Sequence, residues 1–389
     1  MSAINKSIWI IVGIILILNA LLLITGRTYL YKGIANTYLK GRSGPSTTEY
    51  DIFYSREINV GKAQGWAISK NYNKKVLSES NSKSFSKYKT TSFLVIKDDS
   101  IIHEAYWDSF DKTTISNSFS MAKTIVSILV GAAIKEGKIK SENELACNYI
   151  PDFKTDVKKA QITIKDILTM SSGIDFDENY ASPFAYPAQA YYGKELRKLT
   201  LKYQVNKEPG KVFEYLSGNT QLLAMIIEAA TGKKISDYAS EMLWKPIGAE
   251  QKALWNLDDK DGDEKAFCCF ISNARDFARF GKLYLNNGCW NGQQLIDSTY
   301  VKKSISLADL IDKDGNKNDK YGYAWWLLPN YKGLNIFYAR GILGQYIICV
   351  PEKNMIIVRL GRKRAPKTGD EHPADFFIYL DAALDMYGN

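Results

Sequence analysis

Residues 118–124 read Ser-Phe-Ser-Met-Ala-Lys-Thr, at the point where a polar, serine-rich run gives way to an apolar helical pattern. A helix that begins here places Ser120 and Lys123 on the same face, one turn apart. The hydroxyl is then a nucleophile beside a basic amine, and the positive end of the helix dipole stabilises an oxyanion formed at the first turn. The stretch therefore predicts acyl transfer on a serine.

The Ser-x-x-Lys spacing is common in this chain, so the surroundings of each copy must decide which one matters. Four further copies lie at Ser80/Lys83, Ser84/Lys87, Ser86/Lys89 and Ser109/Lys112. The first three fall in the polar stretch 78–89, which indicates a solvated loop, and the fourth falls in a polar turn. Only Ser120 is followed by apolar residues at mostly three- and four-residue intervals, as in a core helix. The alternative is that Ser120 is only a helix N-cap and that Lys123 points to water.

The small number of histidines limits the catalytic mechanisms that the chain can use. The chain has two histidines, His103 and His372, and neither stands in a metal-ligand spacing. The sequence therefore predicts neither a metal site nor a cofactor. A Ser-His-Asp triad would need one of these histidines to reach a serine, and no Gly-x-Ser-x-Gly turn is present. Lysine or tyrosine remains as the group that activates the serine.

Composition and charge place the chain among globular proteins. It has 46% hydrophobic and 24% charged residues, enough for a large core. The net charge of +9 is spread without a long basic block, so no nucleic-acid partner is predicted. We expect the cysteines to be buried small hydrophobic residues, and we do not expect the adjacent Cys268 and Cys269 to pair with each other. The five cysteines are Cys147, Cys268, Cys269, Cys289 and Cys349.

An apolar run at residues 8–25, broken only by Gly13 and Asn19, is long enough for the lower end of the membrane-spanning range. No small-x-small cleavage site is evident near residues 23–26, which favours an uncleaved anchor over a removed signal peptide. We therefore expect a cytoplasmic segment at 1–7 followed by a transmembrane anchor. A cleaved export signal is the alternative.

Two signals for the orientation of this anchor oppose each other. Four cations follow the span, and the positive-inside rule taken alone would leave the body of the protein in the cytoplasm. We expect an extracytoplasmic body, because a lone amino-terminal span normally acts as a signal-anchor and large domains cross largely regardless of charge. The four cations are Arg27, Lys32, Lys40 and Arg42.

The remaining chain divides into a linker, 26–59, and one catalytic domain, 60–389. Two strand-like runs, 92–96 and 101–107, are split by a polar turn and predict a β-hairpin. The patterns between residues 120 and 287 are mostly helical, and a last amphipathic helix is expected at 375–386. Strand patterns return at 323–328, 336–339, 346–350 and 355–360. The sequence thus predicts an α+β fold, with an antiparallel sheet flanked by helices and a separate helical lobe.

Several segments together resemble the serine β-lactamase and penicillin-binding-protein superfamily. The similarity is to its class C-like branch, which contains esterases, D-aminopeptidases and 6-aminohexanoate-dimer hydrolases, and it covers most of residues 92–361. It rests on 118–124, 164–173 (IKDILTMSSG), 213–223 (FEYLSGNTQLL), 267–281, 284–288, 321–327 (YGYAWWL) and 339–351 (ARGILGQYIICVP). The resemblance implies a β-lactamase-like fold, no cofactor, and a small-molecule or short-peptide substrate.

Roles for individual residues follow from this resemblance. Ser120 corresponds to the acylated nucleophile and Lys123 to its proton acceptor or relay. Tyr215 corresponds to the tyrosine of the family's Tyr-x-Asn motif, which acts as a general acid or base. A phenol held beside an ammonium group can share its proton with the serine and later with the leaving group. The asparagine position of that motif holds Ser217, which we keep as a candidate for substrate binding.

The third motif of the family, Lys-Thr-Gly or His-x-Gly, aligns with residues 339–341, so its lysine is absent. Gly341 would let the backbone approach the ligand, and the Ile342 N–H would pair with the Ser120 N–H as the oxyanion hole. Arg340 is a candidate source of positive charge if its side chain faces the cleft. A literal Lys-Thr-Gly at 367–369 follows the last strand and indicates a loop coincidence.

Two more candidates for substrate binding come from other segments. Tyr180 lies in a segment, 175–180, that resembles the substrate-contacting loop of the oligomer hydrolases. Trp325 and Trp326 stand on an expected strand, where neighbouring side chains point to opposite faces, so at most one of them should line the pocket.

These observations predict a membrane-anchored serine hydrolase that cleaves an amide or ester through an acyl-enzyme. A non-catalytic protein of the same fold, which binds cell-wall peptides or β-lactams as a sensor, is the main alternative. A hydrolase with its body on the cytoplasmic side is a third. The altered third motif predicts weak or absent β-lactam turnover.

Overall fold

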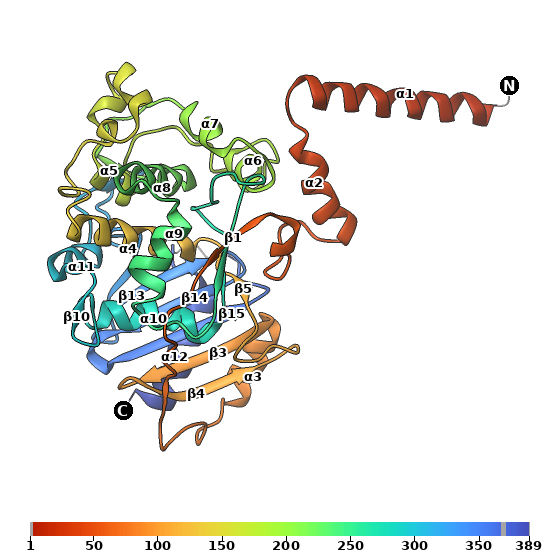
Figure 1. Cartoon of the computed structure of the whole chain (residues 1–389). Helices are drawn as coiled ribbons and strands as arrows, with labels where there is room; N and C mark the ends of the chain where they lie inside the picture. Colours follow the sequence, from red (N-terminus) through yellow and green to blue (C-terminus); the bar gives the residue numbers. More distant parts are fainter. Residues whose placement is uncertain (1–2, 367–370, 389) are drawn as a thin grey trace.

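A seven-stranded sheet forms the centre of the molecule in the computed structural model, which describes residues 3–366 and 371–388 (Figure 1). Its strand order is β12-β13-β14-β15-β3-β4-β2, antiparallel throughout except between β2 and β4. The strands are β2 (Ala67–Ile68), β3 (Thr90–Lys97), β4 (Ser100–Tyr106), β12 (Trp326–Tyr331), β13 (Leu334–Gly341), β14 (Gln345–Val350) and β15 (Met355–Gly361). The predicted hairpin and the predicted later strands therefore join in one sheet.

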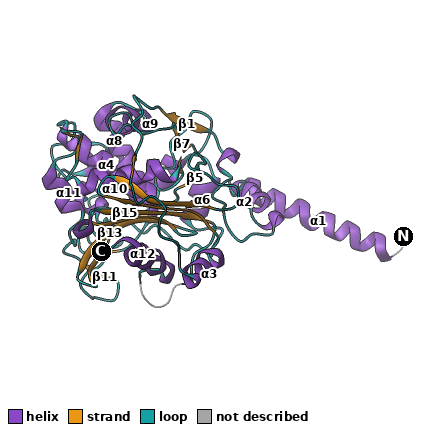
Figure 2. Ribbon diagram, turned by 90° about the horizontal axis from the view of Figure 1, so that it is seen from below, coloured by secondary structure: helices purple, strands orange, loops and turns teal. Residues whose placement is uncertain are grey.

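The alternation of side chains along β3 explains why helices cover both faces of this sheet. Leu94 and Ile96 enter one hydrophobic core, while Phe93 and Val95 enter a second core on the opposite face. The first face is covered by α4 (Met121–Lys135) and α10 (Ala274–Leu285), with α8 (Ser217–Thr231) packed on α4. The second face is covered by α3 (Glu79–Lys87) and α12 (Ala374–Tyr387), as Figure 2 shows.

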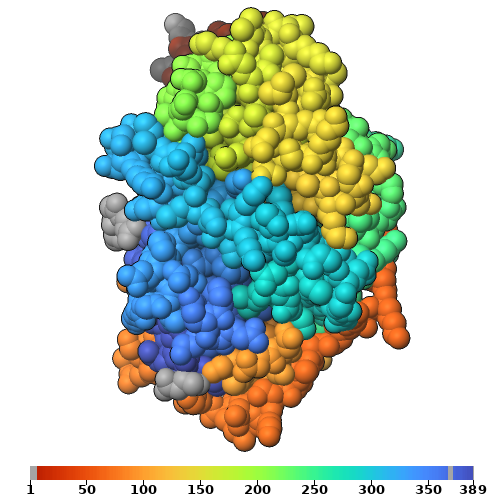
Figure 3. Space-filling view, turned by 90° about the vertical axis from the view of Figure 1, so that its left-hand side faces the viewer, coloured from red at the N-terminus to blue at the C-terminus, as the bar shows by residue number. Residues whose placement is uncertain are grey.

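The helical lobe sits at one end of the sheet, and Figure 3 shows its yellow and green surface above the blue and orange sheet region. The Thr163 hydroxyl and the Asp166 carboxylate form a capping box that starts α5. Gly232, at φ 69°, ends α8, because a left-handed residue at this position is favourable for glycine. The lobe and its surroundings contain α5 (Ile164–Leu168), α6 (Tyr186–Tyr192), α7 (Leu196–Leu201), α9 (Ile235–Ala239), the π-helical turn η6 (Ser240–Trp244) and the 3₁₀ turns η3 (Ala146–Asn148), η4 (Pro151–Thr155) and η5 (Lys159–Gln161).

A smaller four-stranded sheet leads the chain into the nucleophile turn. Its order is β1-β7-β8-β5, and the Ser118 N–H donates to the Phe270 carbonyl oxygen at 2.9 Å just before Ser120. Its strands are β1 (Ser55–Ile58), β5 (Ser116–Asn117), β7 (Ala253–Asn256) and β8 (Phe270–Ser272). The other short elements are β6 (Val212–Phe213) paired with β11 (Ile311–Asp312), β9 (Cys289–Trp290) paired with β10 (Gln293–Gln294), α11 (Ser298–Ser304) and η7 (Pro351–Lys353).

Residues 26–59, expected to be a linker, have defined structure packed on the body. They contain α2 (Tyr29–Asn36), η1 (Tyr38–Lys40), η2 (Tyr50–Ile52) and β1, which pairs with β7. The ring of Tyr192 lies against Gly33, where a Cβ would be 3.3 Å from its nearest carbon. The ammonium group of Lys32 sits 4.0 Å above the Phe53 ring. Such contacts depend on tertiary neighbours that a Gly- and Ser-rich composition does not indicate.

The polar stretch 78–89, expected to be a solvated loop, contains helix α3. The Ser78 hydroxyl accepts a hydrogen bond from the Asn81 N–H at 3.1 Å and caps the helix. Phe85 is the residue of α3 that is buried, with its ring 4.9 Å from that of Phe93 and 4.8 Å from that of Tyr379. One cap and one buried ring are enough for this short helix, and they leave no apolar periodicity in the sequence.

At the amino terminus, α1 (Ala3–Ile24) contains a candidate membrane span at Ser7–Ile24. The span has a mean hydropathy of 2.8, and none of it is buried against the protein. Its length and composition suit a membrane anchor, and an export signal meets the same description.

Candidate active site

Ser120 stands immediately before α4, at the end of a strained turn. Phe119 has φ 44°, a left-handed conformation that is unfavourable for a bulky side chain, and its N–H is held by the Asn117 side-chain oxygen at 2.8 Å. The Ser120 hydroxyl makes no capping hydrogen bond within the described chain and instead accepts one from Lys123 Nζ at 3.0 Å. The interpretation of Ser120 as a simple N-cap is therefore wrong.

Lys123 is buried, with 1% of its surface exposed, so the alternative in which it points to water is also wrong. Its Nζ donates to the Ser120 hydroxyl and, at 2.8 Å, to the backbone carbonyl of Phe267. The same nitrogen lies 5.2 Å from the centre of the Tyr215 ring. The three residues predicted to be catalytic are thus brought together from α4 and from the turn before α8.

Tyr215 presents its hydroxyl while its ring is fixed by neighbouring aromatic side chains. The ring centre lies 5.2 Å from that of Trp326 and 5.9 Å from that of Tyr321. The Tyr215 hydroxyl has no hydrogen-bond partner among residues 3–366 and 371–388, and it is not closed off from solvent. Tyr215 is not one of the residues that line the cavity over Ser120, so its place beside the site rests on its closeness to Lys123.

A cavity of about 980 Å³ opens over the nucleophile. Ser120, Tyr180, Phe267 and Ile342 contribute to its wall. Gly341, which precedes Ile342 at the end of β13, packs so closely on the nucleophile turn that a Cβ there would lie 2.2 Å from the Ser118 carbonyl oxygen. This close approach is the one expected from the glycine of the third motif, and it brings Ile342 to the same cavity as Ser120.

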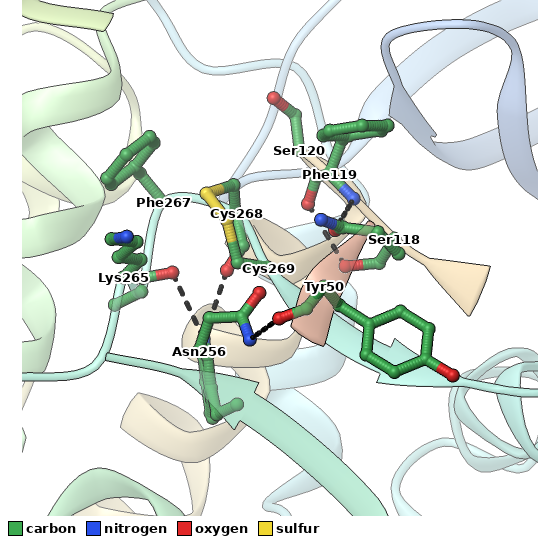
Figure 4. Close-up of a disulfide and its surroundings, with 12 residues drawn as sticks. Tyr50, Ser118, Phe119, Ser120, Asn256, Lys265, Phe267, Cys268 and Cys269 are labelled. Atoms are coloured by element: carbon green, nitrogen blue, oxygen red, sulfur yellow. Dashed lines mark hydrogen bonds between the residues drawn. A yellow bond between two sulfur atoms is a disulfide. The ribbon is translucent and has the colours of Figure 1, made fainter. Parts of the chain in front are cut away.

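Cys268 and Cys269 form a disulfide beside the nucleophile turn (Figure 4). The expectation that these neighbours do not pair is wrong, because Cys269 adopts a left-handed φ of 69°, which a pattern of residue types does not reveal. The backbone around the bridge is anchored: the Trp255 indole N–H donates to the Cys268 carbonyl at 3.0 Å, and the Asn256 N–H donates to the Cys269 carbonyl at 3.0 Å. Cys268 lines the cavity. The free cysteines are Cys147 and Cys349, which are buried, and Cys289, which is half-buried.

The family model described as Beta-lactamase matches residues 83–377. The chain belongs to the beta-lactamase family. Among curated relatives of this beta-lactamase-family chain, the 6-aminohexanoate-dimer hydrolase of Paenarthrobacter ureafaciens is 26% identical over 319 residues, which cover 76% of this chain and 79% of the relative.

Solved structures share the fold of this family member. The structure described as "Putative 6-aminohexanoate-dimer hydrolase from Bacillus anthracis" matches with a TM-score of 0.76 at 22% identity, over 88% of this chain and 92% of that one. A family VIII carboxylesterase matches with a TM-score of 0.64 at 17% identity, over 83% and 99%. The predicted β-lactamase-like α+β fold is confirmed, and the chain is a serine hydrolase of the beta-lactamase family.

In this beta-lactamase-family protein, Glu178 organises two of the predicted binding residues, and the sequence analysis missed it. The Tyr180 hydroxyl donates to its carboxylate at 2.8 Å, and the Ser217 N–H and hydroxyl donate to it at 2.7 and 2.5 Å. Tyr180 lines the cavity, whereas Ser217 is buried outside the cavity wall. Although 56% of the Tyr180 surface is exposed, its hydroxyl lies against Glu178, and the loss of water around that hydroxyl, followed by the charge of the carboxylate, raises the pKa of Tyr180 above 10, so the phenol stays protonated. Leu216, the residue before α8, has no side chain that could cap the helix. The first N–H groups of α8 therefore need an acceptor from another segment, and this need is the signal that could have pointed to Glu178.

Arg340 lies behind Tyr215 and not in the cavity wall. Its guanidinium group stacks 3.3 Å from the centre of the Trp326 ring and donates to the Glu371 carbonyl at 2.5 Å. The Trp326 ring in turn contacts Tyr215. The direct binding role expected for Arg340 is not supported by this position, which suits indirect support of the tyrosine.

Trp325 is a core residue. None of its surface is exposed, and its ring centre lies 4.7 Å from that of Tyr284 and 5.0 Å from that of Phe337. It does not line the cavity, so the expected contact with substrate is not supported. Trp325 and Trp326 enter opposite cores, as the expected alternation predicts, and Trp326 is the one whose ring packs against Tyr215.

The remaining candidates lie elsewhere. His103 and His372 are both buried outside the cavity wall and bond to the hydroxyls of Tyr387 and Tyr338, at 3.3 and 2.7 Å. The literal Lys-Thr-Gly at 367–369 lies outside the described residues. Within the described part of the chain, no cluster of three His, Cys, Asp or Glu residues could hold a metal ion.

Proposed function

We propose that this serine hydrolase cleaves an amide or ester bond of a small molecule or short peptide through an acyl-enzyme formed on Ser120. The observation that carries the proposal is the buried Lys123 amine, 3.0 Å from the Ser120 hydroxyl and beside the Tyr215 ring. A nucleophile within hydrogen-bond reach of its base is the arrangement that covalent catalysis requires.

The Phe267 carbonyl oxygen orients the Lys123 amine. As an ammonium group, Lys123 donates to both Ser120 and Phe267. After it has released one proton to solvent, the neutral amine still donates to Phe267, and its lone pair is then directed at the Ser120 hydroxyl. Lys123 accepts the serine proton as the oxygen bonds to the substrate carbonyl carbon.

Charge on the carbonyl oxygen develops next to the start of α4. The Ser120 N–H, at the positive end of the helix dipole, and the Ile342 N–H are the proposed oxyanion donors. Removing one such donor typically lowers the rate by about 10²–10³-fold.

Tyr215 completes the proton path. Its free hydroxyl passes a proton to the leaving nitrogen or oxygen and is reprotonated through Lys123. Water then attacks the acyl-enzyme, with the same groups acting in reverse, and the acid is released. The Tyr180 hydroxyl, whose proton is directed at Glu178, accepts a hydrogen bond from a donor group of the substrate.

Linear amides and esters fit this site better than β-lactams. Ala339 replaces the lysine of the third motif, and Arg340 is held by Trp326 and Glu371. The similarity to a 6-aminohexanoate-dimer hydrolase also supports a linear substrate over a β-lactam. Rapid nitrocefin hydrolysis by the wild type but not by Ser120→Ala would contradict it.

We also propose that α1 anchors the protein in a membrane with its body on the outer side. The exposed apolar span supports the anchor, and the disulfide at Cys268–Cys269 supports an oxidising compartment. A reporter fused after Asn389 tests the orientation: activity of an outward reporter supports it, and an inward signal overturns it.

A fluorophosphonate probe tests the catalytic proposal. The wild-type protein should be labelled, and Ser120→Ala should not. The matched control is Ser80→Ala, which changes another Ser-x-x-Lys serine on the exposed side of α3 and should be labelled as the wild type is. Folded wild-type protein that takes no label would support the non-catalytic sensor instead.

A further inference from the structure

The cavity over Ser120 has a wall made by the segment next to the candidate membrane span. Besides Ser120, Phe119 and Tyr191, the cavity is lined by one side of α2, the helix that follows α1. The α2 residues in this wall, with the residue just after the helix, are Tyr29, Leu30, Gly33, Ile34 and Thr37. A substrate bound at the nucleophile is therefore within the same cavity as α2.

The chain between the two helices is too short to let α2 move far from the end of the span. From Ile24 to Tyr29 there are five peptide steps, which reach at most about 17 Å when fully extended. The two helices are also tied directly, because the Tyr31 hydroxyl donates to the Asn19 side-chain oxygen at 2.5 Å, and Asn19 is within the span. When α1 crosses a bilayer, α2 lies at its surface.

The outer side of α2 has the composition of a helix at a membrane surface. Tyr31 is exposed by 41% and Leu39, in the following turn, by 78%, and neither of them lines the cavity. Tyrosine rings are enriched at the boundary between lipid and water, and cations nearby favour anionic headgroups. Arg27 precedes this surface in the sequence, whereas the Lys32 ammonium group is directed at the body of the protein, over the Phe53 ring. In Figures 1 and 2, α1 projects away from the body and α2 lies between the two.

We propose that the substrate of this enzyme is a membrane-resident amphiphile, an ester or amide with a long hydrocarbon chain, which enters along α2 and places its carbonyl at Ser120. This inference rests on the proposed nucleophile and on the proposed anchor. The hydrocarbon chain lies against Leu30 and Ile34, and the polar portion occupies the side of the cavity nearer Tyr180. A volume of about 980 Å³ is at the upper end of ordinary ligand pockets, which suits a chain of this kind.

The chain-length dependence of hydrolysis tests the proposal. The full-length protein is placed in phosphatidylcholine vesicles and given p-nitrophenyl esters with acyl chains of increasing length. Each methylene group of the substrate that is buried on binding increases the affinity by about fourfold. We expect kcat/KM to rise at least tenfold from the acetate to the dodecanoate and the rise to appear mainly in KM.

Two matched variants separate the cavity wall from general membrane affinity. Ile34→Ser removes an apolar side chain from the cavity and should lower the ratio of dodecanoate to acetate kcat/KM by about tenfold. Leu39→Ser removes an apolar side chain that is 78% exposed and lies outside the cavity wall, and should leave that ratio unchanged.

The possible outcomes distinguish a failure of the amphiphile proposal from a failure of the proposed serine hydrolase function. Hydrolysis of the acetate with no rise for longer chains, or equal effects of the two variants, would overturn the amphiphile and leave the serine hydrolase in place. Release of the full-length protein from membranes by alkaline carbonate would overturn the route from the bilayer. Absence of both ester hydrolysis and fluorophosphonate labelling would instead remove the proposed function.

Discussion

Lys123 Nζ donates a 2.8 Å hydrogen bond to the backbone carbonyl of Phe267, the residue immediately before the Cys268–Cys269 disulfide. The amine proposed as the base is therefore oriented by a loop that is far away in the sequence and is itself anchored by hydrogen bonds. The proposed reactivity of Ser120 depends on both parts.

Replacing Lys123 with methionine keeps the length of the side chain and removes the amine. Since general bases contribute about 10²–10⁴-fold, we expect kcat for a p-nitrophenyl ester and the rate of fluorophosphonate labelling to fall by at least 10²-fold. Lys83→Met is the control, because Lys83 belongs to another Ser-x-x-Lys copy and forms an exposed pair with Glu79. Equal labelling rates for Lys123→Met and wild type would refute the assigned role.

Tyr215→Phe retains the ring that packs on Trp326 and removes only the hydroxyl. Because p-nitrophenolate leaves without a proton and an amine does not, the loss should be larger for an anilide substrate than for the matching ester. We expect about 10²-fold for the anilide and less than tenfold for the ester, with an unchanged melting temperature. Equal losses for the two substrates would show that Tyr215 does not protonate the leaving group.

Opening the disulfide should slow acylation. A dithiol reductant supplies two electrons and two protons, the bridge becomes two thiols, and the reductant closes its own disulfide. The loop that holds the Phe267 carbonyl then gains freedom, and we expect the labelling rate to fall by about tenfold and to recover after reoxidation. Cys269→Ser should reproduce the fall without reductant, while Cys289→Ser, at a free and half-buried cysteine, should not. Full activity of the reduced protein and of Cys269→Ser would exclude this bracing role.

Lys265 makes the stability of the folded protein depend on pH. It is buried completely, with its nitrogen 3.3 Å from the centre of the Phe53 ring and no hydrogen-bond partner in the described residues. Burial, and secondarily the charge of Lys32, lower the pKa of Lys265 well below 10.5. Above this lowered pKa the folded state holds a neutral amine, whereas the unfolded chain binds a proton below about pH 10.4.

The direction in which stability changes with pH follows from the number of protons bound by the folded and unfolded states. Between the lowered pKa of Lys265 and about pH 10.4 the unfolded state binds more protons, so stability falls as the pH falls, by about 1 kcal/mol per pH unit. Lys265→Met should therefore raise the melting temperature more at pH 7 than at pH 10. Lys252→Met, at an exposed pair with Glu57, is the control. An equal shift at both pH values would mean that Lys265 is charged in the folded protein.

The core of the fold and the closeness of Ser120 to Lys123 could be predicted because their signals are local. The apolar spacing after Ser120 gives α4, and the alternation in β3 and β4 gives the hairpin. Tyr215 could be assigned only through the resemblance, because nothing in its own surroundings distinguishes a catalytic tyrosine from a structural one. Family similarity supplied that contact between distant segments, and the geometry agrees with it.

The parts that could not be predicted depend on backbone conformation or on tertiary partners. The pairing of Cys268 with Cys269 needs a left-handed φ at Cys269. The roles of Glu178 and Arg340 depend on which way a side chain points after the chain has folded. Helix α2 was hidden in a linker-like composition, because its stability comes from contacts with the body such as Tyr192 on Gly33.

A bridge between adjacent residues encloses almost no chain. The entropy that a cross-link removes from the unfolded state grows with the length of the closed loop, so here it contributes about 1 kcal/mol. Calorimetry on oxidised and reduced samples should give nearly superimposable melting curves. The redox state of this enzyme would then be visible in its turnover and not in its thermal stability, so a well-folded preparation made in a reducing host can be largely inactive.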